Sequence, residues 1–190
     1  MDSVGRRSVK TYDFTERLGW SQFVAENNTC LRAILRSRIP RCIDVVRAGP
    51  DEDRCGTDYW AIRDGDLRSL SIDLKARADD PVVTWGKDDV ALEVWSDIGR
   101  KPGWTRDTEK ATDYILWLWE PTNRFLLVPF HPLCETFRRY WQTWTREYKC
   151  SIQTSNSWRS QCVFVPRLVL LGKLQDWMNG QWQDTTGEEV

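Results

Sequence analysis

Two aspartates and one lysine near the middle of the chain have the side-chain types and the spacing to act together. Asp73 and Lys75 lie two residues apart in an alternating segment, 67–75, that predicts a β-strand. Residues two apart on a strand point to the same face, so this carboxylate and this ammonium project together. Asp58 begins the preceding predicted strand, and the Asp-Gly turn at 64–65 predicts a hairpin that brings it toward Asp73.

Two carboxylates beside a lysine are the minimum set for metal-assisted hydrolysis of a phosphodiester bond. Two carboxylates and a backbone carbonyl can hold Mg²⁺, which keeps several of its waters. The metal polarises the phosphate and lowers the pKa of a bound water. The lysine orients that water and offsets the charge that develops in the transition state. The competing interpretation is a solvated sheet face on which Lys75 simply pairs with Asp73.

Loops after the predicted strands carry aromatic and basic residues of the kind that contact nucleic acid. Aromatic rings in loops can stack on bases, and lysine and arginine can contact phosphates. The alternative for a loop tryptophan is packing against the protein core. The residues expected to bind nucleic acid are Arg77, Trp85, Lys87, Arg100, Lys101, Trp104 and Arg106.

The hydrophobic pattern around these residues predicts an α/β (α+β) fold, with a central mixed, mostly antiparallel sheet flanked by helices. A capping-box pattern at 13–16 predicts the start of the first helix, and the first four strands are expected to form a meander. We expect one domain over 1–180 and a polar, flexible tail over 181–190. The predicted helices are 14–37, 108–119, 133–148 and 167–178, and the predicted strands are 42–46, 57–62, 67–75, 90–95, 124–129 and 163–166.

Composition limits the classes of function. The 190 residues are 41% hydrophobic and 29% charged, as in an ordinary globular protein, and no apolar run is long enough for a membrane helix. The N-terminal residues lack the apolar segment of a secretory signal, so we expect a cytoplasmic protein with no membrane partner. A net charge of −1 argues against a nucleic-acid binder that relies on charge alone, although a local basic surface is compatible with it.

Cysteine spacing argues against a zinc module. The six cysteines form no CxxC pair, and the single histidine, His131, offers no second nitrogen ligand. In the cytoplasm these cysteines are expected to be reduced thiols without disulfides.

The two acids and the lysine resemble the active-site motif of the PD-(D/E)XK nuclease superfamily, which is an acid, a variable gap and then acid-any-lysine. Here the motif reads Thr57-Asp58 and then Asp73-Leu74-Lys75, with threonine in the place of the usual proline. Longer segments are similar to a family of small phage and prophage proteins that have this nuclease core. These segments are 54–60, 72–77, 89–96, 103–107, 112–119, 127–130 and 162–166.

The resemblance implies a restriction-endonuclease-like core and a Mg²⁺ or Mn²⁺ cofactor. It implies that Asp58, Asp73 and the carbonyl of Leu74 bind the metal and that Lys75 is the catalytic lysine. Glu93, on the strand expected beside that of Asp73, is the preferred further acid, as a ligand or as a group that positions water. The alternative for Glu93 is a sheet-edge glutamate paired with an arginine.

The function expected from these observations is a metal-dependent nuclease that hydrolyses nucleic-acid phosphodiester bonds, with DNA favoured over RNA. The resemblance implies a phage or prophage gene and therefore action in the host cytoplasm. The alternative is a catalytically inactive nuclease-fold protein that binds nucleic acid or a host protein. Lys75→Ala and Asp73→Asn are expected to abolish cleavage. Asp73→Asn is also expected to hold or raise stability, because buried carboxylates without a metal repel each other.

Overall fold

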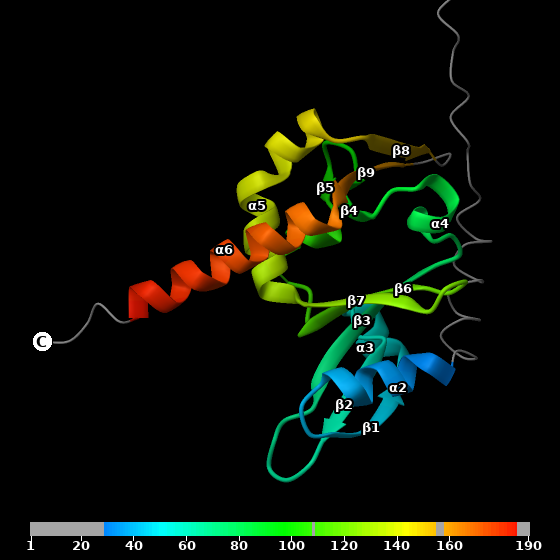
Figure 1. The fold of residues 1–190 in the computed structure, drawn as a ribbon, viewed down its shortest axis with the longest axis vertical. Helices are drawn as coiled ribbons and strands as arrows, with labels where there is room; N and C mark the ends of the chain where they lie inside the picture. The colour runs from blue at the N-terminus through cyan, green and yellow to red at the C-terminus, as the bar shows by residue number, and fades with distance from the viewer. Residues whose placement is uncertain (1–28, 108, 155–157, 186–190) are drawn as a thin grey trace, which may run out of the picture.

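The computed structural model describes residues 29–107, 109–154 and 158–185, which form a mixed α+β protein with two sheets and flanking helices (Figure 1). Most of the helix predicted at 14–37 lies outside the described residues, and its last part is α2, Thr29–Arg38. None of the helices in the described ranges is long and apolar enough to cross a membrane. All six cysteines are free thiols.

The first sheet is mixed and has five strands in the order β1-β2-β3-β6-β7. β1, β2 and β3 form an antiparallel meander, β6 runs parallel to β3, and β7 returns antiparallel to β6. A parallel pair needs a long crossover, and here residues 78–113 provide it while also contributing to the second sheet. The strands are Cys42–Arg47 (β1), Tyr59–Arg63 (β2), Leu70–Arg77 (β3), Tyr114–Trp119 (β6) and Arg124–Pro129 (β7).

The second sheet has four antiparallel strands in the order β5-β4-β9-β8. The strand predicted at 90–95 was expected to continue the first meander, and this expectation is wrong because β4 pairs with β9 instead. The polar segment before it folds as the short helix α4, Pro81–Trp85, which redirects the chain away from β3. The strands are Asp89–Asp97 (β4), Lys101–Pro102 (β5), Cys150–Thr154 (β8) and Arg159–Pro166 (β9).

Two hydrophobic cores cover the two faces of the first sheet. On one face α2 packs Leu31 and Leu35 against Ile72 and Leu116 of β3 and β6. The other core lies between the two sheets and the helices α5, Phe130–Glu147, and α6, Arg167–Thr185.

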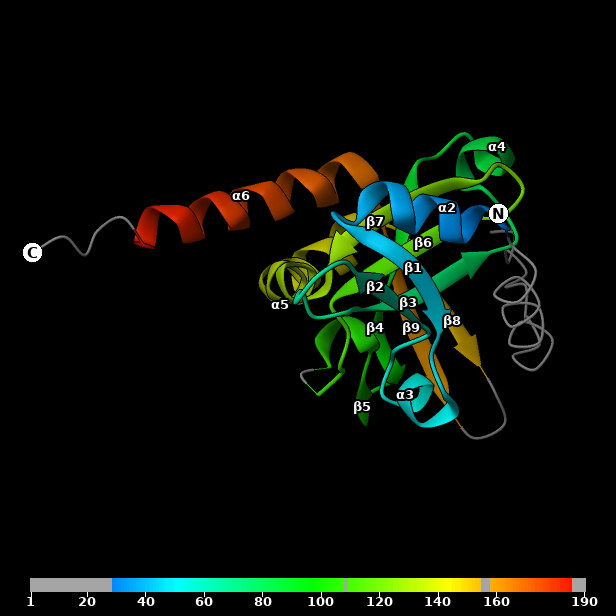
Figure 2. The same ribbon diagram turned by 90° about the horizontal axis from the view of Figure 1, so that it is seen from below.

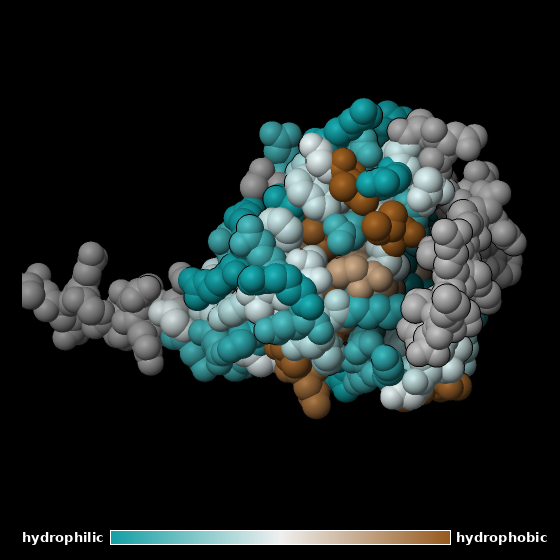
Figure 3. Space-filling model, turned by 90° about the horizontal axis from the view of Figure 1, so that it is seen from above, coloured by the Kyte–Doolittle hydropathy of each residue, from teal (hydrophilic) through white to brown (hydrophobic). Residues whose placement is uncertain are grey.

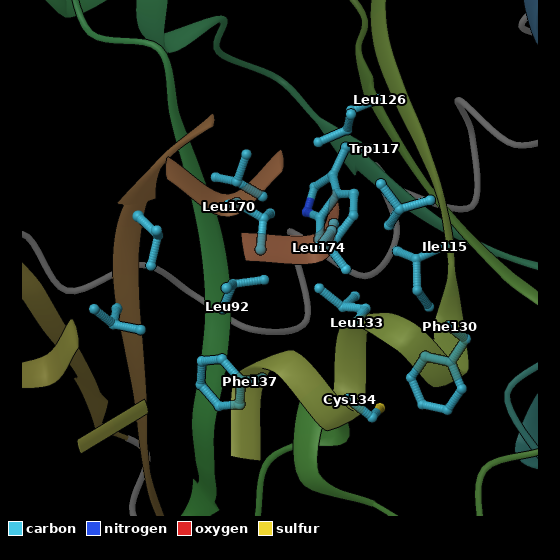
Figure 4. Packing of buried hydrophobic residues seen from close by; sticks show 14 of the residues in the cluster. Leu92, Ile115, Trp117, Leu126, Phe130, Leu133, Cys134, Phe137, Leu170 and Leu174 are labelled. Carbon is cyan, nitrogen blue, oxygen red and sulfur yellow. The ribbon is translucent and has the colours of Figure 1, made fainter. Parts of the chain in front are cut away.

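Trp117 is one of the largest side chains that the second core buries. Figure 4 shows its ring pointing from β6 toward Leu170 and Leu174 of α6. Complete burial of a side chain of this size contributes roughly 2–3 kcal/mol from the removal of apolar surface from water. The Trp117 contacts therefore help to fix the distance between β6 and the helical layer, and β6 lies beside the strand that carries Asp73.

Residues 114–119 form the strand β6, not part of the helix predicted over 108–119. Ile115 and Trp117 face the core between the sheets, whereas Leu116 and Leu118 face the core under α2. A strand buried on both faces lacks the alternation of a half-exposed strand. Its continuous apolar run therefore matched the helical spacing as well as a strand.

The predicted helix, strand and helix at the C-terminal end are present in that order, but the structure adds the strand β8, which was not predicted. The strand predicted at 163–166 begins earlier, and α6 continues to Thr185, into the region predicted as a tail. Figure 2 shows α6 extending away from the rest of the protein. On the face drawn in Figure 3, the coloured surface is mostly hydrophilic, and hydrophobic residues form small spots within it. Residues 186–190 lie outside the described residues.

Candidate active site

The register of the β2–β3 hairpin places Asp58 opposite Asp73. Tyr59 pairs with Ile72, and the Asp58 amide donates a hydrogen bond to the Ile72 carbonyl at 2.9 Å. Tyr59 and Ile72 face the α2 core, so the alternation of both strands turns Asp58 and Asp73 to the opposite face. Side chains directly opposite each other on antiparallel strands have Cβ atoms about 5 Å apart. The hairpin therefore brings the two carboxyl groups together, as the sequence predicted.

Lys75 joins the two acids on the same face. Its Nζ lies 2.7 Å from Oδ1 of Asp73, whose side chain is only 4% exposed. Asp58 Oδ2 accepts a hydrogen bond from the Leu74 amide at 2.5 Å, at the point where the β2–β3 ladder ends. The backbone of β3 and the side chain of Asp58 are therefore locked together beside the buried carboxylate.

Lys110 is a further member of the site that the sequence analysis did not identify. Its Nζ lies 2.6 Å from Oδ2 of Asp73, and its side chain is only 10% exposed. It comes from the segment between the short helix η1, Trp104–Arg106, and β6. No local pattern marks this lysine, because only the crossover between the two sheets brings it to Asp73.

The two carboxyl groups differ in charge state. Burial and then the charge of Asp73 raise the pKa of Asp58 to about 7, and the Leu74 amide and Lys75 offset this only in part. Burial also raises the pKa of Asp73, but the charges of Lys75 and Lys110 outweigh burial and hold this pKa below its ordinary value. Asp73 is therefore ionised at neutral pH, whereas Asp58 is close to half protonated. With Asp58 protonated, the four side chains carry one net positive charge.

Lys75 and Lys110 change the stability expected of Asp73→Asn. From the sequence, Asp73→Asn was expected to hold or raise stability, because buried carboxylates without a metal repel each other. In the structure each oxygen of Asp73 has its own ammonium partner. Removing this carboxylate takes away the direct partner of two buried or half-buried ammonium groups, so we expect Asp73→Asn to lower stability. The repulsion belongs instead to Asp58, whose pKa is raised.

The two carboxylates and one carbonyl meet the requirements of a hard divalent cation. The N–H and C=O of a strand residue point to the same edge, so the Leu74 carbonyl faces the Asp58 side along with its amide. Mg²⁺ takes one or two carboxylates and keeps several waters. The partner of Asp73 Oδ2 is the Lys110 ammonium, 2.6 Å away. Oxygen ligands of the right type are thus present for Mg²⁺ or Mn²⁺.

Two tryptophans form the wall behind Lys75. The Trp104 ring centroid lies 5.1 Å from Lys75 Nζ, and the Trp104 ring contacts that of Trp117 at a centroid distance of 5.9 Å. Trp104 is half-buried and was expected to stack on a nucleic-acid base. Its actual position restricts the Lys75 ammonium to the space over the ring, where cation–π attraction favours it.

Glu93 does not lie beside Asp73. Its strand, β4, belongs to the second sheet. The next residue along this strand, Val94, faces the core, so Glu93 points away from the core. The Glu93 carboxylate accepts hydrogen bonds from the Ser96 hydroxyl at 2.8 Å and from the Trp104 amide at 3.1 Å. Its role in the structure is to hold the turn that carries Trp104.

No acid takes the place predicted for Glu93. Across residues 29–107, 109–154 and 158–185, no group of three or more His, Cys, Asp or Glu side chains is arranged to hold a metal. Any metal at Asp58 and Asp73 would therefore rely on the Leu74 carbonyl and on water for its remaining ligands.

The other residues expected to bind nucleic acid are scattered. Arg106 lies between the rings of Trp95 and Trp141, with its guanidinium carbon 4.7 Å and 4.4 Å from their centroids. Its charge therefore makes cation–π contacts within the protein. Trp85 is 59% exposed on α4. The remaining predicted residues lie at the surface or half-buried at strand ends and loops, and they are Arg77, Lys87, Arg100 and Lys101.

Comparisons with known proteins found no match to this chain among family models, curated proteins or solved structures.

Proposed function

We propose that this protein is a metal-dependent nuclease with a restriction-endonuclease-like core, which hydrolyses phosphodiester bonds of nucleic acid, in DNA rather than RNA. The observation that carries this proposal is the pair of facing carboxyl groups, Asp58 and Asp73, with Lys75 beside them. Like charges directly opposite each other on neighbouring strands cost stability. Perturbed carboxyl groups of this kind are typical of sites that handle a cation or a proton.

Each member of the site has a role in this proposal. Asp58, Asp73 and the Leu74 carbonyl would hold Mg²⁺ or Mn²⁺, which supplies an acidic bound water and polarises the phosphate. Lys75 would keep its ammonium at the scissile phosphate and offset the charge of the transition state. Trp104 and Trp117 exclude water from one side of Lys75, and this strengthens the electrostatic interactions of its ammonium.

The substrate class follows from charge and from the surroundings of the site. With a divalent cation bound, the two lysines and the metal would outweigh the two ionised carboxylates, and this positive site would favour an approaching phosphate. The exposed Trp85 and the basic residues Lys87, Arg100 and Lys101 support contacts to bases and to the phosphate backbone. The resemblance to phage and prophage proteins supports a phage-encoded enzyme that acts in the host cytoplasm.

The test is cleavage of labelled single-stranded, duplex and branched DNA and of RNA, with Mg²⁺, with Mn²⁺ and with EDTA. Wild type is compared with Lys75→Ala and with Lys173→Ala, a control that removes a lysine paired with Asp176 at the surface. We expect the wild type and the control to cut DNA only with metal, and Lys75→Ala to cut very slowly. If the wild type cuts none of these substrates, the nuclease proposal is wrong.

A second candidate function is a nuclease-fold protein that binds nucleic acid, or a host protein, without cleaving. It is favoured by Lys110, whose ammonium already neutralises the Asp73 oxygen that a metal needs. For such a protein, binding to labelled DNA is expected to be the same with Mg²⁺ and with EDTA. Lys75→Ala is then expected to have no larger effect on binding than the surface control.

A further inference from the structure

Asp73 is unusual because two lysines each take one of its oxygens, one from its own strand and one from a distant segment. Lys75 Nζ lies 2.7 Å from Oδ1 and Lys110 Nζ lies 2.6 Å from Oδ2. One ammonium is enough to neutralise one carboxylate, so the second needs its own explanation. Burying a lysine is costly unless its charge is used, and Lys110 is the more deeply buried of the two.

Hydrogen bonds at Ala111 and the open space at Gly56 position the Lys110 side chain. The Ala111 amide donates a hydrogen bond to the Cys55 carbonyl at 3.1 Å, and the Thr57 hydroxyl donates one to the Ala111 carbonyl at 2.8 Å. These bonds fasten the segment to the turn just before Asp58. The lysine stem then crosses Gly56, where a Cβ atom would lie 2.6 Å from the Lys110 Nζ and 2.8 Å from its Cγ.

Glycine at position 56 therefore serves two purposes. Its φ of +94° is a conformation that other residues adopt only with strain. Its missing side chain leaves the space through which Lys110 reaches Asp73. Hydrogen bonds hold the segment that carries Lys110, and the missing side chain of Gly56 leaves room for its stem. This lysine is therefore part of the site and not a surface side chain that has folded inward.

A divalent cation and the Lys110 ammonium would compete for Asp73 Oδ2. A metal would bind this oxygen at about 2.0–2.1 Å, and the ammonium lies 2.6 Å from the same atom. The two positive charges would then face each other in a site with little water, where repulsion is far stronger than in solution. One of them has to leave the oxygen.

We propose that Lys110 is an internal cation that competes with divalent metal for Asp73, so that metal binds only as the Lys110 ammonium moves off Oδ2. This inference rests on the metal site of the proposed function. Lys110 keeps the metal-free site neutralised and folded, and it sets the metal concentration at which the site fills. Lys75 keeps its contact with Oδ1 in both states.

The test is the affinity for Mn²⁺, measured by isothermal titration calorimetry on the full chain. Lys110→Gln keeps a hydrogen-bond donor near Asp73 but removes the charge, and Lys173→Gln makes the same change at a surface site on α6. We expect Lys110→Gln to bind Mn²⁺ at least tenfold more tightly than wild type and Lys173→Gln to bind it equally. Unchanged or weaker binding by Lys110→Gln overturns the inference.

A second variant covers the case in which Lys110→Gln does not fold. Gly56→Ala pushes the lysine stem aside and leaves its charge in the protein. Backbone strain at this position lowers the melting temperature, but it does not by itself raise metal affinity. We expect tighter Mn²⁺ binding by this variant as well, and unchanged affinity in the folded variant overturns the inference.

Activity separates this inference from the proposed function. If wild type cuts DNA with Mn²⁺ while Lys110→Gln binds the metal no more tightly, the competition is wrong and the nuclease proposal stands. If Lys110→Gln binds Mn²⁺ more tightly but neither protein cuts any substrate, the competition stands and the nuclease proposal is wrong. If neither protein binds Mn²⁺, the competition is wrong as well.

Discussion

Two buried aspartates, Asp73 within β3 and Asp80 just beyond its end, have very different surroundings. Asp80 is 1% exposed and is surrounded by donors. It accepts hydrogen bonds from the Thr122 hydroxyl at 2.5 Å, from Arg124 at 2.5 Å and from the Val82 amide at 3.0 Å. Asp73 is equally buried, but its partners are two ammonium groups, and a second carboxyl group lies opposite.

The pKa values reflect this difference. Burial raises the pKa of Asp80, but the hydrogen bonds from Thr122 and Val82 and the charge of Arg124 outweigh burial and lower it. Asp88 shares Arg124 with Asp80, and hydrogen bonds from Arg167 and Arg124 outweigh burial and lower the pKa of Asp88 as well. At the Asp73 site the pKa of one acid, Asp58, is raised to about 7. A buried carboxylate therefore does not by itself indicate a functional site. What distinguishes the Asp73 site is that one of two facing acids, Asp58, has a raised pKa although a lysine lies nearby, whereas Asp80 and Asp88, which share Arg124, both have lowered pKa values.

The largest expected difference between the two regions is in cleavage rate. Lys75→Ala is expected to slow cleavage about 100- to 1,000-fold, because a preorganised charge at the transition state is lost. Asp80→Asn, at a position outside the site, is expected to cut at the wild-type rate below its melting temperature. Single-turnover rates with saturating Mg²⁺ measure both. An equal loss in the two variants would mean that general stability, and not the chemistry of the site, limits the rate.

Asp73→Asn is expected to lower the free energy of unfolding by about 3–5 kcal/mol, because it removes the direct ion-pair partner of the Lys75 and Lys110 ammonium groups. Urea denaturation at pH 7 without metal measures this. The control is Asp176→Asn, which breaks an exposed pair with Lys173 and is expected to change stability by about 1 kcal/mol or less. Wild-type stability in Asp73→Asn would restore the original view of a self-repelling acidic cluster.

Asp80→Asn is expected to cost about 1.5–3 kcal/mol at pH 7, since hydrogen bonds to a charged group are weakened. The folded pKa of Asp80 is lowered, so its contribution is present above the unfolded pKa of about 4 and is lost as pH falls through the folded value. The difference in free energy of unfolding between the variant and wild type, measured by urea titration, should therefore shrink steadily below about pH 4. A difference that does not depend on pH would assign the effect to packing.

Asp58→Asn is expected to act in the opposite direction and to raise stability by about 1–3 kcal/mol at pH 8. The folded pKa is raised, so the wild type loses stability as pH rises between the unfolded value of about 4 and the folded value of about 7. An asparagine can still accept the Leu74 hydrogen bond. Melting curves at pH 4.5 and pH 8 measure the gain, which should nearly vanish at the lower pH. A loss of stability at pH 8 would contradict the raised pKa.

The local part of the candidate site was predictable from the sequence. The alternation around Asp73 and Lys75 and the Asp-Gly turn at 64–65 define a hairpin, and a hairpin defines which side chains share a face. The register then places Asp58 opposite Asp73. Which residues share a face depends only on the strand period, but the exact register does not follow from the turn. A two-residue turn at 64–65 would place Asp58 opposite Ser71, whereas the longer connection over 64–69 places it opposite Asp73.

The parts that failed depend on contacts between distant segments. Glu93 lies on a strand, as predicted, but a strand pattern does not say which sheet it joins when a long loop precedes it. The segment 114–119 is buried on both faces, so its pattern did not distinguish a strand from a helix. Lys110 lies in a loop with no pattern of its own, and only the contact with Gly56 reveals its path.

The pairing of β4 with β9 has a consequence for how the chain folds. β4 lies within the crossover from β3 to β6, but Leu92 finds its partner only at Val163, near the C-terminal end of the described chain. During synthesis the β1–β3 meander can form as soon as it emerges, whereas β4 must wait with apolar residues and open hydrogen-bonding groups exposed. Pairings this far apart in sequence fold slowly, and an unpaired apolar strand invites aggregation. The C-terminal half of the chain is therefore what protects the strand that supports the Trp104 turn beside the candidate site.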